Sequence, residues 1–80
     1  MSPARKEPDA STYAGRFAIR LRTLREKAGL TPEEAAEKIG VSAKSIYNWE
    51  SGIREMSQNY YPVAAEALGL KSIRALIPEK

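Results

Sequence analysis

Residues 31–50 read TPEEAAEKIGVSAKSIYNWE, two helix-forming segments joined by the short sequence Gly40-Val41-Ser42. A glycine at the end of the first segment can adopt the positive φ that stops a helix. A serine two residues later can cap the helix that follows. This tight turn suits two helices that cross at a steep angle, and it allows the second helix to protrude from the rest of the protein.

Local signals fix the start of the first helix in this pair. Thr31 is the N-cap, and Glu34 three residues later completes a capping box. Pro32 at the first helical position loses no hydrogen bond, and two acidic residues in the first turn suit the positive end of the helix dipole. The helix is predicted to end at Ile39. Its buried side chains are predicted to be Ala35, Ala36 and Ile39.

The second helix of the pair is predicted over residues 43–51, with Ser42 as its N-cap. At about 100° per residue, an inward direction set by Ile46 places Ser42, Trp49 and Glu50 on the buried side. The residues that point outward are Ala43, Lys44, Tyr47 and Asn48. This outward face is short and polar, and the major groove of B-DNA is wide enough to accept one such helix.

The remaining predicted helices cover residues 13–28, 60–68 and 71–77. The first is capped by Thr12 or Ser11, and one apolar stripe runs along it. The stripe consists of Phe17, Leu21, Leu24 and Ala28. Pro62 is tolerated only in the first turn of its helix, which sets the start of that helix. No segment alternates with the period of a strand, so the chain is predicted to be all-α with five short helices.

Composition narrows the function. The 80 residues carry 13 Lys+Arg against 10 Asp+Glu, a net charge of +3, and contain neither cysteine nor histidine. The commonest general base, the thiol nucleophile and the usual metal ligands are therefore missing. We expect no enzyme, no metal, no cofactor and no small-molecule ligand, because a domain of this size has little room for a pocket.

Length allows one domain. Residues 1–11 contain two prolines and no large apolar residue after Met1, and they are predicted to be a flexible N-terminal arm. Residues 12–78 are predicted to form the globular domain. No apolar run approaches the roughly 20 residues that span a bilayer. The protein is therefore expected in the cytoplasm, with no membrane partner.

Several segments, in this order, resemble the lambda-repressor/Cro-like family of helix-turn-helix regulators, also called XRE-like. They are Gly29-Leu30-Thr31-Pro32-Glu33-Glu34-Ala35-Ala36, Gly40-Val41-Ser42, Trp49-Glu50-Ser51-Gly52 and Ala64-Ala65-Glu66-Ala67-Leu68-Gly69-Leu70. The resemblance covers roughly residues 13–77. It implies five packed helices, with the third as recognition helix in the major groove of double-stranded DNA. It also implies a homodimer on a pseudo-palindromic operator. There the protein is expected to act as a repressor that blocks polymerase, with recruitment of polymerase as the alternative.

The resemblance implies roles for particular residues of this chain. Base contacts fall to Ala43, Lys44, Tyr47 and Asn48, and phosphate contacts to Ser42 and Arg54. Support of the recognition helix falls to Arg25, Glu50, Ile46 and Trp49, with Arg25 and Glu50 as a charge pair. The basic stripe of the first predicted helix adds phosphate contacts from Arg16 and Arg20, for which a solvated helix face is the alternative explanation.

Two positions depart from the family pattern. Many members have a phosphate-binding glutamine where this chain has Pro32, and proline has no N–H to donate. The amides of Glu33 and Glu34 remain to face a phosphate, although their own carboxylates would repel it. Met56 stands where many members have proline, and Arg54 with the loop amides remains available for phosphate contacts.

These departures and the modest net charge favour a second interpretation. In it the chain is a protein-interaction module, antitoxin-like or an adaptor, that keeps the helix-turn-helix fold with weak or no specific DNA binding.

A homodimer would need an apolar patch on the surface. The candidates for that patch are Ile19, one tyrosine of the adjacent pair Tyr60–Tyr61, Ile73 and Ile77, because adjacent tyrosines are not expected to face one core together.

Overall fold

The computed structural model describes residues 9–78, and four α-helices and two 3-10 turns follow one another along them. They are α1 (Tyr13–Lys27), α2 (Pro32–Ile39), α3 (Ala43–Glu50), η1 (Gln58–Tyr60), α4 (Tyr61–Ala67) and η2 (Ile73–Leu76). No strand occurs between residues 9 and 78, so the all-α prediction is confirmed there. Most of the predicted N-terminal arm, residues 1–8, lies outside the described residues.

The prediction of five helices is wrong, because the last of them is only the 3-10 turn η2. The side chain of Ser72 makes no capping hydrogen bond at its start. At its other end Ile77 is extended, with ψ of 127°, because the residue before a proline is disfavoured in helical conformation. A segment that is stopped this soon cannot complete the turns of a stable α-helix.

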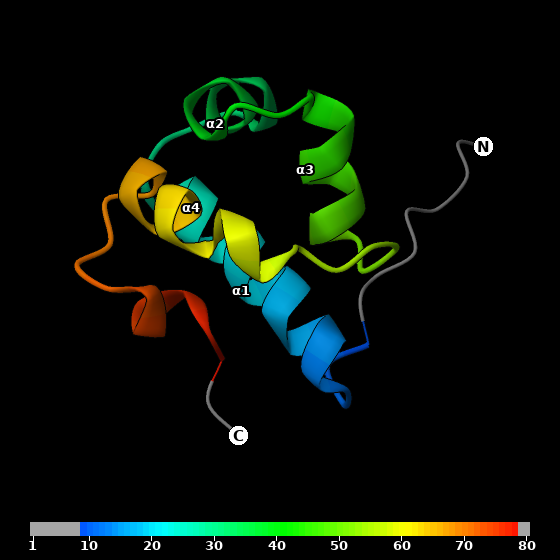
Figure 1. Ribbon diagram of the computed structural model, residues 1–80. Coiled ribbons are helices and arrows are strands. Elements are labelled where there is room, and N and C mark those ends of the chain that lie inside the picture. The colour runs from blue at the N-terminus through cyan, green and yellow to red at the C-terminus, as the bar shows by residue number, and fades with distance from the viewer. Residues whose placement is uncertain (1–8, 79–80) are drawn as a thin grey trace.

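The helices pack around α1, the longest element. In Figure 1, α2 and α3 lie together at the top of the molecule, α4 crosses α1, and η2 lies at the side remote from α3. The core joins all four helices, the α3–η1 loop and η2. Its buried members are Phe17, Leu21, Ala35, Ala36, Ile39, Ile46, Trp49, Met56, Ala64, Leu68 and Leu76. Met56, the departure from the family pattern, is therefore a core residue, with 4% of its surface exposed.

Two predictions about packing need correction. Ala28 is exposed rather than buried, because α1 ends at Lys27 and Ala28 is its C-cap. Both adjacent tyrosines pack on the core: the Tyr61 ring stacks on Phe17 with centroids 5.6 Å apart, and the Tyr60 ring lies 5.4 Å from that of Trp49. The two rings can both reach the core because the chain changes there from η1 to α4, so one helical direction does not govern both.

The predicted start of α2 is confirmed. The amide of Glu34 donates to Thr31 Oγ1 at 3.1 Å, and the amide of Thr31 donates to Glu34 Oε1 at 2.8 Å, which is the capping box. At the other end of α2, Gly40 has φ of 91°, and its amide donates to the Ala36 carbonyl at 2.8 Å. The left-handed residue stops α2 and turns the chain toward α3.

None of the helices within the described residues is both long enough and apolar enough to pass through a membrane.

Candidate nucleic-acid interface

The core fixes one side of α3. Ile46 is 1% exposed and Trp49 is 7% exposed, and the Trp49 ring packs against Tyr60. Ser42 caps the helix as predicted, with its hydroxyl oxygen accepting from the Ser45 amide at 3.3 Å. The inward direction predicted from Ile46 is therefore confirmed for Trp49 and Glu50, whereas Ser42 at the N-cap is exposed, so its predicted inward position is wrong.

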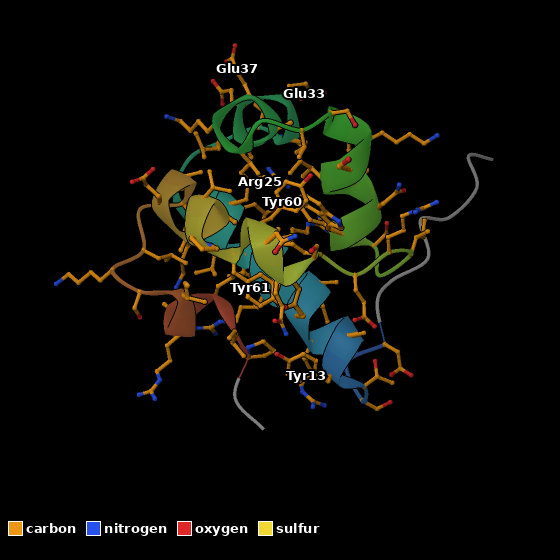
Figure 2. The ribbon with its side chains drawn as sticks, in the orientation of Figure 1. Tyr13, Arg25, Glu33, Glu37, Tyr60 and Tyr61 are labelled. Atoms are coloured by element: carbon orange, nitrogen blue, oxygen red, sulfur yellow. The ribbon has the colours of Figure 1, made fainter. Side chains whose placement is uncertain are left out.

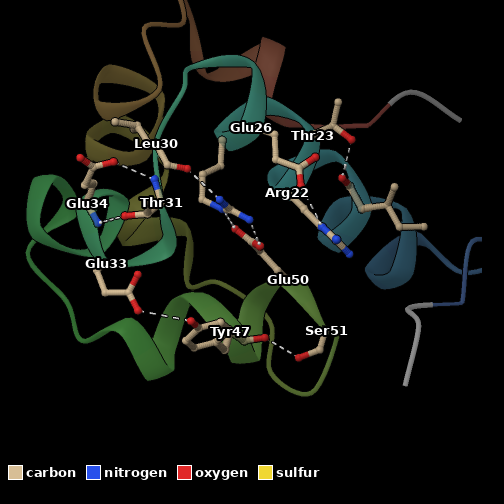
Figure 3. Close-up of polar contacts among 12 residues, drawn as sticks. Arg22, Thr23, Glu26, Leu30, Thr31, Glu33, Glu34, Tyr47, Glu50 and Ser51 are labelled. Atoms are coloured by element: carbon tan, nitrogen blue, oxygen red, sulfur yellow. Dashed lines mark hydrogen bonds and ion pairs between the residues drawn. The ribbon is translucent and has the colours of Figure 1, made fainter. Parts of the chain in front are cut away.

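A buried ion pair holds the end of α3 to α1. Arg25 Nε lies 2.7 Å from Glu50 Oε2, and Arg25 Nη2 lies 3.1 Å from Glu50 Oε1, so the guanidinium grips the carboxylate with two bonds. Arg25 Nη1 also donates to the Leu30 carbonyl at 2.7 Å (Figure 3). The bond to Glu50 raises the pKa of Arg25 above its usual value, although burial opposes this. Three elements, α1, α3 and the α1–α2 turn, are thus locked at one guanidinium.

The outer side of α3 carries the residues predicted to read bases. Lys44 is exposed, Tyr47 has 40% of its surface exposed, and Ala43 and Asn48 are half-buried at the edges of the face. The buried residues of α3, which are Ile46, Trp49 and Glu50, lie on its other side. A helix rigidly held at one side and polar at the other can enter a groove without rearranging the core.

The loop after α3 is bonded to the helix itself. The main-chain carbonyl of Asn48 accepts from the amides of Ile53 and Arg54 at 3.0 and 3.2 Å. The sequence-based expectation that these loop amides stay available for phosphates is therefore wrong for these two. The Arg54 side chain is exposed and begins beside the end of α3, so the guanidinium rather than the amide is its means of reaching an anion.

The start of α2 offers few donors to an anion. Pro32 has no N–H, and the amide of Glu34 is used by the capping box, which corrects the expectation that it faces a phosphate. A contact that the sequence did not predict lies beside it: the Tyr47 hydroxyl donates to Glu33 Oε2 at 3.3 Å (Figure 3). An acidic side chain of α2 therefore borders the outer face of α3.

Arg16 and Arg20 are not brought together with α3. Arg20 Nε donates to the Ala75 carbonyl at 2.8 Å, and Arg16 Nη1 donates to the Ala10 carbonyl at 3.3 Å. The groove beside Arg20 is lined by the C-terminal segment, namely by Ser72, Arg74, Ala75, Ile77 and Pro78. The two arginines bond the first and last parts of the described chain to α1, and their phosphate contacts stay a prediction.

The contacts that sequence reasoning missed join residues far apart in the chain. Glu33 and Tyr47 are 14 positions apart, and Arg20 and the Ala75 carbonyl are 55 apart. One signal was available for the first contact, since Glu33 lies in the first turn of one helix and Tyr47 on the outward face of the next. The crossing of α2 and α3 that brings them together is a tertiary property.

Comparison with known proteins places the chain in a family. Residues 16–77 match the family described as "Helix-turn-helix domain". The restriction-modification controller protein C.AhdI from Aeromonas hydrophila is 32% identical, with a TM-score of 0.73, over 78% of this chain and 92% of that one. The clp gene regulator ClgR from C. glutamicum is 27% identical, with a TM-score of 0.69, over 94% of this chain and 86% of that one.

A third solved structure shares the fold alone. The hypothetical transcription factor NHTF from Neisseria is 23% identical, with a TM-score of 0.77, over 98% of this chain and 87% of that one. No curated protein resembles the chain closely enough to match. The motifs around α2 and α3 and these likenesses agree, so the resemblance to lambda-repressor/Cro-like regulators is confirmed. The chain belongs to the helix-turn-helix domain family.

Proposed function

We propose that the protein is a sequence-specific regulator of transcription that inserts α3 into the major groove of double-stranded DNA and acts as a repressor by occupying its operator. The observation that carries the proposal is the outer face of α3, where exposed Lys44 and Tyr47 stand on a helix held from behind by the core and by the Arg25–Glu50 pair. Such a helix fits the width of the groove.

Three of the four side chains on this face have a matching chemistry on a base edge, and Tyr47 is the fourth. Lys44 can donate to guanine O6 and N7, Asn48 can pair with adenine N6 and N7, and Ala43 can contact a thymine methyl group. Ser42 at the start of α3 and Arg54 after its end are suited to the flanking phosphates. The Ser42 hydroxyl lies 3.2 Å from that of Ser45, and either can be the donor, so the Ser42 proton can pass to a phosphate when Ser45 donates in this pair.

Two relatives support a regulatory role by their names. C.AhdI is called a controller protein of a restriction-modification system, and ClgR is called a regulator of the clp gene. A chain of the same family that presents a polar helix face suits the same broad task.

We further propose that the protein acts as a homodimer. Ile19 on α1 and Ile73 in η2 each have 39% of their surface exposed, and Ile77 lies half-buried in the same region. The two tyrosines offered as partners for this patch pack on the core instead. Two-fold pairing would place two copies of α3 on half-sites about 34–36 Å apart, one turn of the duplex.

A protein-interaction module is the second candidate function. The observation that favours it is the start of α2, where Pro32 has no amide to donate, the Glu34 amide is used by the capping box, and Glu33 and Glu34 present carboxylates. In that case the fold would bind another protein, and DNA only weakly and without sequence preference.

A salt-dependent mobility-shift titration separates the two functions. Duplexes selected from random sequence are compared with shuffled duplexes of the same composition. The DNA-binding proposal predicts that affinity falls steeply as salt rises, and that the selected duplex stays preferred throughout. Equal and weak binding to both duplexes would contradict it and favour the interaction module.

A further inference from the structure

The junction of α2 and α3 carries a carboxylate at the rim of the proposed DNA-reading face. The Tyr47 hydroxyl donates to Glu33 Oε2 at 3.3 Å, which ties the outer face of α3 to the first turn of α2 (Figure 3). Both residues are exposed. The contact therefore stands where a bound duplex would pass, and it is formed before any duplex arrives.

This rim is poorly suited to a phosphate. At the start of α2 the amides of Thr31 and Glu34 are both committed to the capping box, at 2.8 and 3.1 Å, and Pro32 has none. The Glu33 carboxylate beside them repels an anion. A phosphate placed here would meet negative charge and few donors.

The same rim is well suited to a hydrogen-bond donor. An ionised carboxylate only accepts hydrogen bonds, and the proton of the Tyr47 hydroxyl is already given to it. In the major groove the donors are the amino groups of adenine N6 and cytosine N4, whereas guanine and thymine present oxygen acceptors at the corresponding places. Acceptors that face acceptors lose the hydrogen bonds that water had supplied to both.

We propose that Glu33 is a specificity-determining residue, which accepts a hydrogen bond from an adenine or cytosine amino group on the strand that passes α2 beside Tyr47. Tyr47 is its positioning residue, because the hydroxyl holds the carboxylate over α3. This inference rests on the proposed function, and it adds a base-contacting residue of α2 to the base-contacting residues of α3.

The experiment measures the affinity of the full chain for the selected duplex and for duplexes in which each half-site position is changed in turn to all four bases. Glu33→Gln is the test variant, because an amide both donates and accepts. Glu37→Gln is the matched control: it removes the same charge one turn further along α2, where Glu37 is exposed and projects outward (Figure 2). Melting curves check that both variants fold.

The expected result is confined to one position of the half-site. There the wild type prefers adenine or cytosine to guanine or thymine by about fivefold or more, and Glu33→Gln reduces this preference to within about twofold. Tyr47→Phe lowers the preference at the same position by a smaller factor. Glu37→Gln leaves it unchanged.

Three results would overturn the inference, each for a different reason. Tighter binding of Glu33→Gln to every duplex by one common factor means that Glu33 only repels phosphate. An unchanged preference in Glu33→Gln means that Glu33 does not reach the bases. A wild type without preference at any position contradicts the proposed function itself, and the inference with it.

Discussion

At the scale of the single residue, Arg25 connects the interior to the proposed function. It is 9% exposed, and its guanidinium is bonded to both oxygens of Glu50 and to the Leu30 carbonyl. A buried charge is tolerated only when its hydrogen bonds are satisfied, as they are here. The orientation of α3, and with it the proposed DNA-reading face, therefore depends on hydrogen bonds inside the protein.

Replacement of Arg25 tests this dependence. Arg25→Ala is expected to lower the free energy of unfolding by about 3–5 kcal/mol, because Glu50 is left as a buried charge without a partner. The double variant Arg25→Met/Glu50→Leu, which leaves no charge behind, is expected to lose less. Urea denaturation measures both. A loss below about 1 kcal/mol in Arg25→Ala is typical of an exposed pair and would contradict the buried geometry.

The Tyr61 phenol is expected to make the folding stability of the protein decrease at alkaline pH. Burial, with Tyr13 and Glu55 nearby, raises the pKa of Tyr61 above its ordinary value of 10.0. The unfolded chain therefore loses this proton first, so the contribution to stability is complete below pH 10.0 and is lost as pH rises through the folded-state pKa.

Tyr61→Phe keeps the ring against Phe17 and removes the titration. Between about pH 8 and about pH 11, the urea midpoint of Tyr61→Phe is expected to fall less than that of the wild type. Chemical denaturation at the two pH values is the measurement. Equal falls in the two proteins would show that burial of this phenol does not matter to stability.

At the scale of the element, the turn between α2 and α3 sets the angle at which α3 is presented. Gly40 has φ of 91°, and a Cβ added there would meet nothing within 4 Å, so its requirement is one of backbone conformation and not of space. Gly40→Ala is expected to cost about 1–2 kcal/mol of unfolding free energy. Gly40→Asn should cost less, because asparagine tolerates the left-handed region. Thermal denaturation ranks the three proteins, and equal costs for alanine and asparagine would contradict this reason.

The elements also show what sequence alone can predict. The Thr31 and Ser42 caps, the extent of α2 and the burial of Trp49 and Glu50 follow from interactions within a few residues and are confirmed. Of the two caps predicted for α1, Thr12 or Ser11, the structure has Thr12. The sequence predicted an α-helix where the structure has the 3-10 turn η2. The missing cap at its start and the proline after its end together prevent a longer helix, and their combined effect is not visible in the sequence pattern.

In the candidate site, too, some features follow from the local sequence and others depend on tertiary packing. The outward position of Lys44 and Tyr47 follows from helical periodicity, and it was predicted. The direction in which an arginine of α1 points depends on how distant segments pack together, which the sequence does not show. In the structure Arg16 donates to the Ala10 carbonyl and Arg20 donates to the Ala75 carbonyl. The bond between Tyr47 and Glu33 needs the crossing of two helices, which no local pattern contains.

At the scale of the whole molecule, the proposed homodimer predicts the mass of the particle that the protein forms in solution. Ile73→Glu puts a charge into the proposed interface, because Ile73 in η2 is one of the residues of the proposed apolar patch and is 39% exposed. The wild type is expected to sediment as a dimer and Ile73→Glu as a monomer. Ile53→Glu is the control, since Ile53 is 71% exposed in the loop after α3 and should not change the mass. A wild type that sediments as a monomer at every concentration would contradict the proposed dimer.

The central claim is that the outer face of α3 reads base edges, and Asn48→Ala tests it most directly. Bound sequences are selected from random duplexes with the wild type and with Asn48→Ala, and the two sets of preferences are compared position by position. We predict that Asn48→Ala loses about 1–3 kcal/mol of discrimination at one base pair of each half-site and keeps the other preferences. Identical preferences in the two proteins would contradict the claim.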